Sequence, residues 1–249
     1  MPRRILIINP NTSASMTEEI RRSAEAVKLP DTELTYTNPS EGPESIETYL
    51  DEALSAIGAL RIIASKREEF DAFVIACGDD PGLNGAREIT DKPVVPIGQA
   101  PMLIAPLLGR RFSILGTWSG DQARSEDKVA RYGLSAFLAS VVPSGETVLS
   151  SHRNHEALLA RFEAMGRKAV DEDGAEVLIL TCAGLAGLHN RLQERLGVPV
   201  LEGISCAVRL AEMLVDLGLR TSRSHQHRPL PAPKTLRGFD DFCGLDCFK

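Results

Sequence analysis

The sequence predicts an α/β fold of two similar lobes, each a parallel sheet flanked by helices, related by a pseudo-twofold duplication. Three observations predict it. Short continuous apolar runs alternate with helical patterns, which is typical of βαβ units in a parallel sheet. This alternation starts again near residue 110. Cys77 and Cys182, 105 positions apart, end two matching apolar runs, FDAFVIAC and GAEVLILTC, so the two halves match as a repeat.

The composition is that of a globular protein that buries a full core without disulfides or structural metal. The chain has 249 residues, of which 43% are apolar and 25% are charged. A net charge of −6 and an aromatic content of 5% argue against nucleic-acid binding. The longest uncharged stretch, 93–109, contains four prolines and does not match a membrane span. After Arg3 and Arg4, only four apolar residues, 5–8, come before Asn9. This apolar run is too short for a secretory signal, so we expect a cytoplasmic protein with reduced cysteines.

The first half begins with an apolar run at 4–8, as expected of a strand buried on both faces. Thr12 or Ser13 is placed to cap the next helix, and Ser45 is placed to cap a longer helix that ends near Arg67. The apolar positions at helical spacing along that longer helix are Ile46, Leu50, Leu54, Ile57, Leu60 and Ile63. Further strands are expected at 33–37, 73–76 and 94–95, with a helix through Ala86 and Ile89.

The second half repeats this order of elements. Strands are expected at 112–115, 177–180 and 198–201, with a helix at 185–196 and a final helix at 207–217. The predicted domains are a first lobe at 1–105, a second lobe at 106–205, and a final helix and tail at 206–249. We expect this last segment to pack back on the first lobe or on a neighbouring subunit.

Cys77 and Cys182 lie where parallel sheets bind ligands. Such sites form beyond the carboxyl ends of the strands, and each cysteine follows a strand end and precedes a helix start. Unpaired N–H groups at a helix start attract anions and lower the pKa of a nearby thiol from about 8.5. Two facing thiols can invert a stereocentre beside a carbonyl, because one removes a proton and the other returns one on the opposite face. N–H donors would stabilise the carbanion.

Five segments, in order along nearly the whole chain, form a specific combination: INPNTSASMT (8–17), GPESIETYLDEA (42–53), IACGDDPGLNGARE (75–88), TCAGLAGL (181–188) and GVPVLEGISCAVRLAEMLVDLGLRTS (197–222). This combination resembles the Asp/Glu/hydantoin racemase family, and within it the hydantoin and allantoin racemase branch. The resemblance implies cofactor-independent racemisation by Cys77 and Cys182. It also implies two similar lobes with the active site in the cleft between them, usually in oligomers. The bare backbone donors of Cys182-Ala183-Gly184 suit a neutral cyclic amide such as a hydantoin better than a free carboxylate.

The other site candidates lie at the same strand ends or in the loops beside them. Side chains at the first and fifth strand ends are expected to hydrogen-bond substrate, and backbone N–H groups after the cysteines to hold its carbonyl oxygens. The expected substrate-binding residues are Asn9, Pro43, Ser45, Gly78, Asp79, Thr117, Ala183 and Gly184. Gly78 stands where many relatives have an aromatic residue, and Trp118 where smaller polar residues are common.

Other functions stay open from the sequence. They are a racemase of free aspartate or glutamate, a maleate isomerase of the same superfamily, and a non-catalytic two-lobed protein that binds a small molecule. We expect no metal, and the resemblance implies no cofactor. The first strand ends in Asn-Pro-Asn and not in glycines, which argues against a dinucleotide site. The expected partners are a small-molecule substrate and further copies of the chain, with no nucleic acid and no membrane.

Several polar residues have a structural interpretation as well. Cys206 is expected to be a buried thiol on the approach to the final helix. Asp79 or Asp80 is expected to cap the helix that begins near Pro81. A metal site in the tail is the less favoured alternative for Cys243, Cys247, His225 and His227, because zinc sites more often have cysteines two residues apart.

Overall fold

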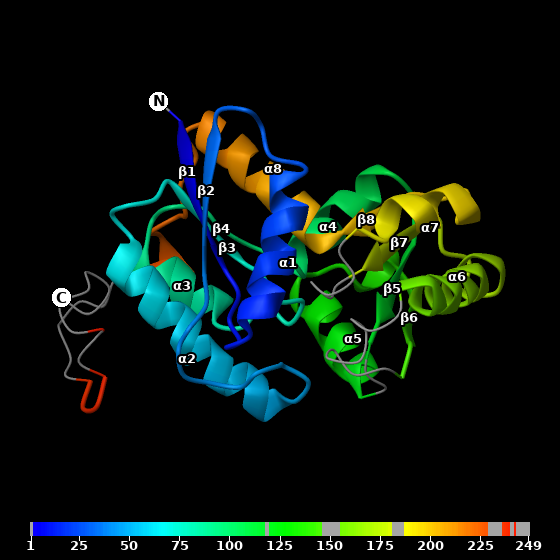
Figure 1. Cartoon of the computed structure of the whole chain (residues 1–249), viewed down its shortest axis with the longest axis horizontal. Helices are drawn as coiled ribbons and strands as arrows, with labels where there is room; N and C mark the ends of the chain where they lie inside the picture. The colour runs from blue at the N-terminus through cyan, green and yellow to red at the C-terminus, as the bar shows by residue number, and fades with distance from the viewer. Residues whose placement is uncertain are drawn as a thin grey trace.

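Two four-stranded parallel sheets with the same strand order form the core of the molecule, in a computed structural model that describes residues 2–117, 120–145, 155–180, 187–228, 236–239 and 242 (Figure 1). The first sheet has the order β2-β1-β3-β4, with β1 (Arg3–Ile8), β2 (Thr32–Thr37), β3 (Ala72–Ile75) and β4 (Val94–Pro96). The second has the order β6-β5-β7-β8, with β5 (Phe112–Gly116), β6 (Leu138–Pro143), β7 (Val177–Leu180) and β8 (Val200–Glu202). The predicted fold class is confirmed, and the equal strand orders agree with the predicted repeat.

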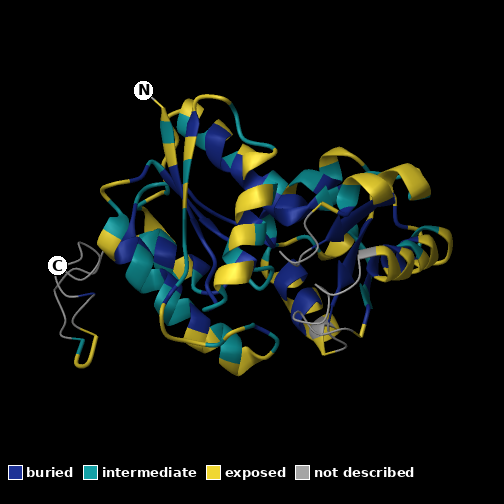
Figure 2. Cartoon of the chain, in the orientation of Figure 1, coloured by how far each residue is buried: buried dark blue, intermediate teal, exposed yellow. Residues whose placement is uncertain are grey.

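The central strand β1 is buried on both faces, as its continuous apolar run predicts. Its last four residues are at most 1% exposed. Because side chains alternate across a strand, Ile5 and Ile7 enter one apolar cluster and Leu6 and Ile8 enter another on the opposite face. Figure 2 shows buried strands between helices whose outer faces are exposed.

Eight α-helices within the described residues cover the sheets: α1 (Ala14–Glu25), α2 (Tyr49–Lys66), α3 (Leu83–Ile89), α4 (Gln99–Ile104), α5 (Asp121–Arg131), α6 (His155–Asp171), α7 (His189–Leu196) and α8 (Gly203–Asp216). Ser13 caps α1, as expected, with its Oγ accepting from the N–H of Met16 at 3.3 Å. None of the helices in this part of the chain is long and apolar enough to cross a bilayer.

The cap of α2 is Thr48, so the prediction of Ser45 is wrong. The Asp51 N–H donates to Thr48 Oγ1 at 3.2 Å, and the Thr48 N–H donates to Asp51 Oδ2 at 2.9 Å, which completes a capping box. The expected buried face was also too wide, since Leu50 and Leu54 are 67% and 47% exposed. The core-facing side of α2 is centred instead on small residues and Ile63.

The two lobes exchange helices. After β4 the chain enters α4, whose Met102 lies in the apolar cluster of the second lobe beside Phe112 and Ile179. After β8 the chain enters α8, which supplies Ile204, Ala207, Val208 and Ala211 to the cluster around β1 in the first lobe. Each core is therefore completed by a helix that follows the last strand of the other lobe.

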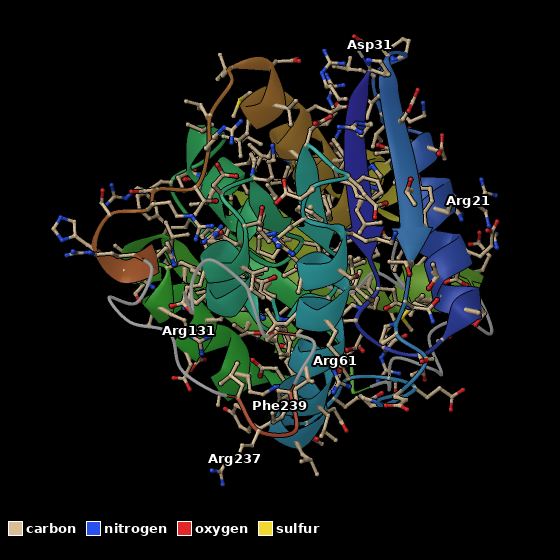
Figure 3. All side chains as sticks on the ribbon, turned by 90° about the vertical axis from the view of Figure 1, so that its left-hand side faces the viewer. Arg21, Asp31, Arg61, Arg131, Arg237 and Phe239 are labelled. Atoms are coloured by element: carbon tan, nitrogen blue, oxygen red, sulfur yellow. The ribbon has the colours of Figure 1, made fainter. Side chains whose placement is uncertain are left out.

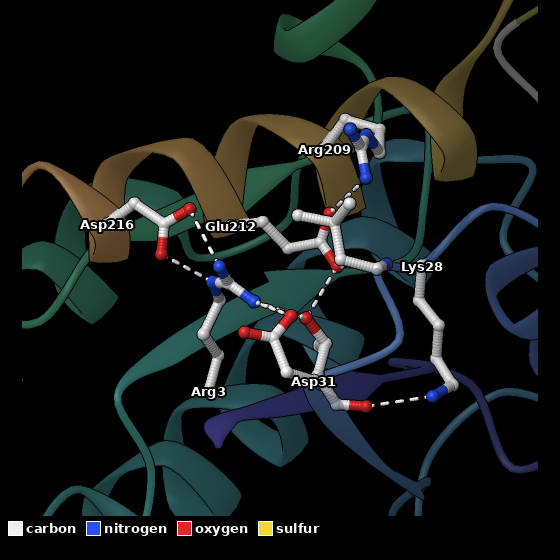
Figure 4. Close-up of polar contacts among 8 residues, drawn as sticks. Arg3, Lys28, Asp31, Arg209, Glu212 and Asp216 are labelled. Atoms are coloured by element: carbon white, nitrogen blue, oxygen red, sulfur yellow. Dashed lines mark hydrogen bonds and ion pairs between the residues drawn. The ribbon is translucent and has the colours of Figure 1, made fainter. Parts of the chain in front are cut away.

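Polar contacts fasten α8 to the strands of the first lobe (Figure 4). Glu212 is only 1% exposed, and its Oε1 accepts from the N–H of Leu29 and from Thr32 Oγ1, both at 2.7 Å. Arg3 of β1 pairs with Asp216 of α8 and with Asp31. A buried carboxylate with fully used acceptors fixes the position of α8 more firmly than an exposed pair does.

The described residues after α8 return along the first lobe. Thr221 donates from its N–H to Asp91 O at 2.7 Å, and Arg223 Nη1 donates to Glu88 O at 2.6 Å near the end of α3. Leu236 and Phe242 join the apolar cluster beneath α2 and α3. Phe239 lies beside α2, where Figure 3 labels it. Cys243 and Cys247 lie outside the described residues.

Candidate active site

Hydrogen bonds from the side chain of Asn9, which is 1% exposed, order the loop after β1. Its Nδ2 donates to Asn11 Oδ1 at 2.8 Å, to Thr17 Oγ1 at 3.0 Å and to Ser13 O at 3.1 Å. The amide of Asn9 thus orders the turn from strand to helix at the carboxyl edge of the first sheet. The expected role of Asn9 in direct substrate binding stays a prediction.

The segment that holds Pro43 and Ser45 is tied to the same loop. The Thr12 N–H donates to Pro43 O at 3.0 Å, so the segment lies beside the carboxyl end of β1. Ser45 is half-buried, and its hydroxyl donates to Glu47 Oε2 at 2.8 Å. Pro43 therefore lies beside the loop that follows β1, and the role of both residues in a wall of the site stays a prediction.

The turn after β3 holds Cys77 at this same edge. The Ala76 N–H donates to Ile8 O at 2.8 Å, which keeps the chain beside β1 up to the residue before the cysteine. The Asp80 N–H then donates to Cys77 O at 3.1 Å and closes a tight turn. Asp80 has a φ of 56°, a left-handed conformation that aspartate tolerates better than most residues. Cys77 is a half-buried free thiol.

The carboxylate of Asp80 holds the turn in place. Its Oδ1 accepts from the N–H of Gly98 at 2.8 Å, and its Oδ2 accepts from the hydroxyl of Tyr132 at 2.5 Å. Gly82 precedes α3 and no side chain caps that helix, so the prediction that Asp79 or Asp80 caps it is wrong. The carboxylates of this turn instead reach the start of α4 and the second lobe.

Asp79 forms a buried ion-pair cluster with α5 of the second lobe. Its Oδ2 lies 3.0 Å from Arg124 Nη2 and its Oδ1 lies 3.3 Å from Lys128 Nζ. Lys128 Nζ also donates to Gly78 O at 2.6 Å. These two cations were not predicted from the sequence. Their spacing of four residues, continued by Tyr132, is the signal of one helix face.

The charges of this cluster act on Cys77 in opposite directions. Burial raises the pKa of the Cys77 thiol well above its usual value, and the carboxylates of Asp79 and Asp80 raise it further. The backbone N–H of Asp79, which hydrogen-bonds the sulfur, and the ammonium of Lys128 lower that pKa. The expectation that the helix start lowers the pKa of Cys77 is therefore wrong, because burial outweighs the N–H donor. The raised pKa predicts that Cys77 is a thiol, a proton donor, at neutral pH.

Comparison with known proteins places the chain in a family. The family model for Asp/Glu/hydantoin racemases matches residues 5–211. The chain belongs to the Asp/Glu/hydantoin racemase family. It is 41% identical over 221 residues to a hydantoin racemase of Pseudomonas sp. (strain NS671), covering 88% of this chain and 89% of the relative. A hydantoin racemase of Rhizobium meliloti is also 41% identical, over 224 residues, covering 88% and 91% of the two chains.

Solved structures agree with this membership. The allantoin racemase from Klebsiella pneumoniae is 38% identical with a TM-score of 0.91, covering 96% of this chain and 98% of that one. The allantoin racemase from Pseudomonas fluorescens is 36% identical with a TM-score of 0.90, covering 94% and 99%. The chain is therefore an isomerase of the racemase type.

In the second lobe of this racemase, Thr117 follows β5 as Asn9 follows β1. It is 5% exposed, and its carbonyl oxygen accepts from the Gly145 N–H at 2.7 Å and from Ser144 Oγ at 2.9 Å. Residues 181–186, which include Cys182, Ala183 and Gly184, lie outside the described residues, as does Trp118.

The remaining predicted side chains have structural positions. Cys206 is 8% exposed within the cluster around β1, which confirms it as a core thiol, and burial raises its pKa to about 12. In the described ranges, no three His, Cys, Asp or Glu side chains are grouped so that they could hold a metal ion. His225 and His227 lie in the short helical turn after α8.

Proposed function

We propose that this racemase inverts the C5 stereocentre of hydantoins, either 5-substituted hydantoins or allantoin, with Cys77 and Cys182 as the acid/base pair. The observation that carries the proposal is the position of Cys77, held at the carboxyl edge of β3 by the turn to Asp80 and by contacts from the second lobe. Cys182 follows β7 by the same number of residues as Cys77 follows β3. The named hydantoin and allantoin racemases, 36–41% identical, support the choice of substrate.

The reaction needs two protons and no net redox change. One cysteine thiolate takes the proton from C5, and the C–H electron pair moves into an enolate on the adjacent ring carbonyl. The other cysteine donates its thiol proton to the opposite face of C5, and the enolate electrons return to form the new C–H bond. The raised pKa of Cys77 favours its entry into the cycle as the donor. The thiol and thiolate roles are exchanged after each inversion.

The substrate is proposed to lie between the two strand edges. Backbone N–H groups of Gly78, Ala183 and Gly184 would hold the ring carbonyls, as a neutral cyclic amide requires. Asn9, Pro43, Ser45, Asp79 and Thr117 would shape the surrounding walls. The side-chain carboxylate of Asp79 stays in its ion pairs with Arg124 and Lys128 of α5.

Polarimetry of enantiopure substrates tests the function. The wild-type protein should abolish the optical rotation of an enantiopure 5-substituted hydantoin or of allantoin, and should leave aspartate, glutamate and maleate unchanged. Cys77→Ser and Cys182→Ser should each lose racemisation by at least about a hundredfold. Normal racemisation by both serine variants would overturn the mechanism. Activity on an amino acid alone, or fumarate formed from maleate, would overturn the substrate.

We also propose that the racemase is a cytoplasmic homo-oligomer. Exposed apolar side chains on α4 and the turn after it support association, since Leu103, Leu107 and Leu108 are 49%, 82% and 50% exposed. The free thiols of Cys77 and Cys206 agree with a reducing compartment. Sedimentation at several protein concentrations tests the first proposal, and a monomer throughout would overturn it. Cell fractionation tests the second.

A further inference from the structure

One face of α5 runs along the turn that holds Cys77. Arg124, Lys128 and Tyr132 follow one another at intervals of four residues, so they share one side of the helix. Arg124 contacts Asp79. Lys128 contacts Gly78 O and Asp79, and Tyr132 contacts Asp80. The second lobe thus touches each of the three residues that follow the cysteine of the first lobe.

Lys128 is the centre of this row and is almost completely buried. The residue is 4% exposed, and a lysine is rarely buried to that extent unless it is paired. Its ammonium lies 2.6 Å from Gly78 O and 3.3 Å from Asp79 Oδ1. Removing an ammonium from water is unfavourable, so a lysine buried to this extent needs a strong compensating interaction. That interaction is made with the peptide next to Cys77.

We propose that Lys128 is a positioning residue for Cys77, its ammonium holding the Gly78 carbonyl and the Asp79 carboxylate so that the sulfur can release and regain a proton in place. The inference rests on the proposed function of Cys77. Two carboxylates, Asp79 and Asp80, lie near the sulfur and oppose formation of a thiolate. The Lys128 ammonium offsets their negative charge. Its hydrogen bond to Gly78 O also holds the peptide that follows Cys77 in position.

Proton exchange in D₂O distinguishes this role from a structural one. Each enantiomer of a 5-substituted hydantoin presents its C5 proton to one cysteine, and Cys77→Ser and Cys182→Ser establish which enantiomer faces which. In Lys128→Met, exchange of the enantiomer that faces Cys77 should fall about ten- to hundredfold, while exchange of the other stays within about threefold of wild type. Damage to the fold would slow both enantiomers alike.

Two further variants complete the test. Lys128→Arg keeps the positive charge and should show a smaller loss confined to the same enantiomer. Arg131→Met is the matched control, since Arg131 is an exposed cation on the same helix (Figure 3), and both exchange rates should be unchanged. If Lys128→Met does not fold, Lys128→Arg decides.

Equal slowing of both enantiomers, or no slowing, would overturn the inference and leave the proposed function intact. A wild-type protein that exchanges neither enantiomer of any hydantoin would overturn the proposed function itself, and the inference with it.

Discussion

Asp80 is the residue whose environment has the clearest thermodynamic consequence. Burial raises its pKa from 3.8 to about 6, although Lys128, Tyr132 and the Gly98 N–H favour its charged form and Asp79 opposes it. An acid with a raised pKa takes up a proton on folding between these two values. The stability that it contributes is therefore present below about pH 4 and is lost as the pH rises to about 6.

Asp80→Asn should remove this dependence. Relative to the variant, the wild-type protein should lose up to about 3 kcal/mol of unfolding free energy between about pH 4 and pH 6, and the difference should stay constant above that. Urea unfolding of both proteins across this range measures it. A difference that does not change with pH would show that Asp80 titrates as an ordinary carboxylate.

Gly98 is the residue that the turn of Cys77 requires at the start of α4. A Cβ at this position would lie 2.3 Å from Gly78 O and 2.6 Å from Asp80 Oδ1, closer than real contacts allow. Its φ of −77° is open to any residue, so the requirement comes from space and not from conformation. Gly98→Ala should displace Gly78 and cost about 2–4 kcal/mol of stability. Thermal unfolding and racemisation rates check this, and an unchanged variant would contradict the close approach.

The start of α2 gives a prediction at the scale of one element. Thr48→Ala should cost about 1 kcal/mol, because it leaves the N–H of Asp51 without its cap. Ser45→Ala is the matched control, and its effect should be below about 0.5 kcal/mol because the Ser45 side chain bonds the half-buried carboxylate of Glu47 in a loop and caps no helix. Chemical denaturation compares them. A larger loss of stability in Ser45→Ala than in Thr48→Ala would show that Ser45 caps α2, as the sequence predicted.

Strands and their neighbouring helices could be predicted because their signals are local. The continuous apolar runs of β1, β3 and β7 gave correct strands, and α8 was predicted within a few residues. The elements α4, α5, β6 and α6 were not predicted. α5 has few apolar residues and uses polar side chains to contact the other lobe, so an apolar stripe was absent there.

The site could be predicted only where it depends on strand ends. Cys77 and Asn9 follow buried apolar runs, which placed them at the carboxyl edge of the sheet. The partners of Asp79 could not be found in this way, because Arg124 and Lys128 are 45 and 49 residues distant and approach across two lobes. A local pattern carries no information on such a contact.

The exchange of helices between lobes determines how the whole molecule should unfold. Since α8 completes the core around β1 and α4 completes the core beside β5, neither lobe keeps its core if the other unfolds. We expect one cooperative transition in calorimetry, with equal calorimetric and van't Hoff enthalpies. Two separated transitions would show that the lobes are independent.

Substitution of Glu212 tests how strongly α8 is held on the first lobe. Glu212→Ala leaves the Leu29 N–H and the Thr32 hydroxyl without their acceptor, so it should cost about 2–4 kcal/mol. Asp216→Asn alters an exposed pair with Arg3 and should cost less than about 1 kcal/mol. Both changes should shift the whole transition without splitting it.

The most direct measurement is deuterium incorporation at C5 by the two serine variants, followed by NMR on each enantiomer of one hydantoin. If a sulfur from each lobe flanks the same carbon, Cys77→Ser will still exchange one enantiomer and Cys182→Ser only the other, with no inversion in either case. Exchange of the same enantiomer by both variants, or of both enantiomers by either, would contradict a two-cysteine racemase.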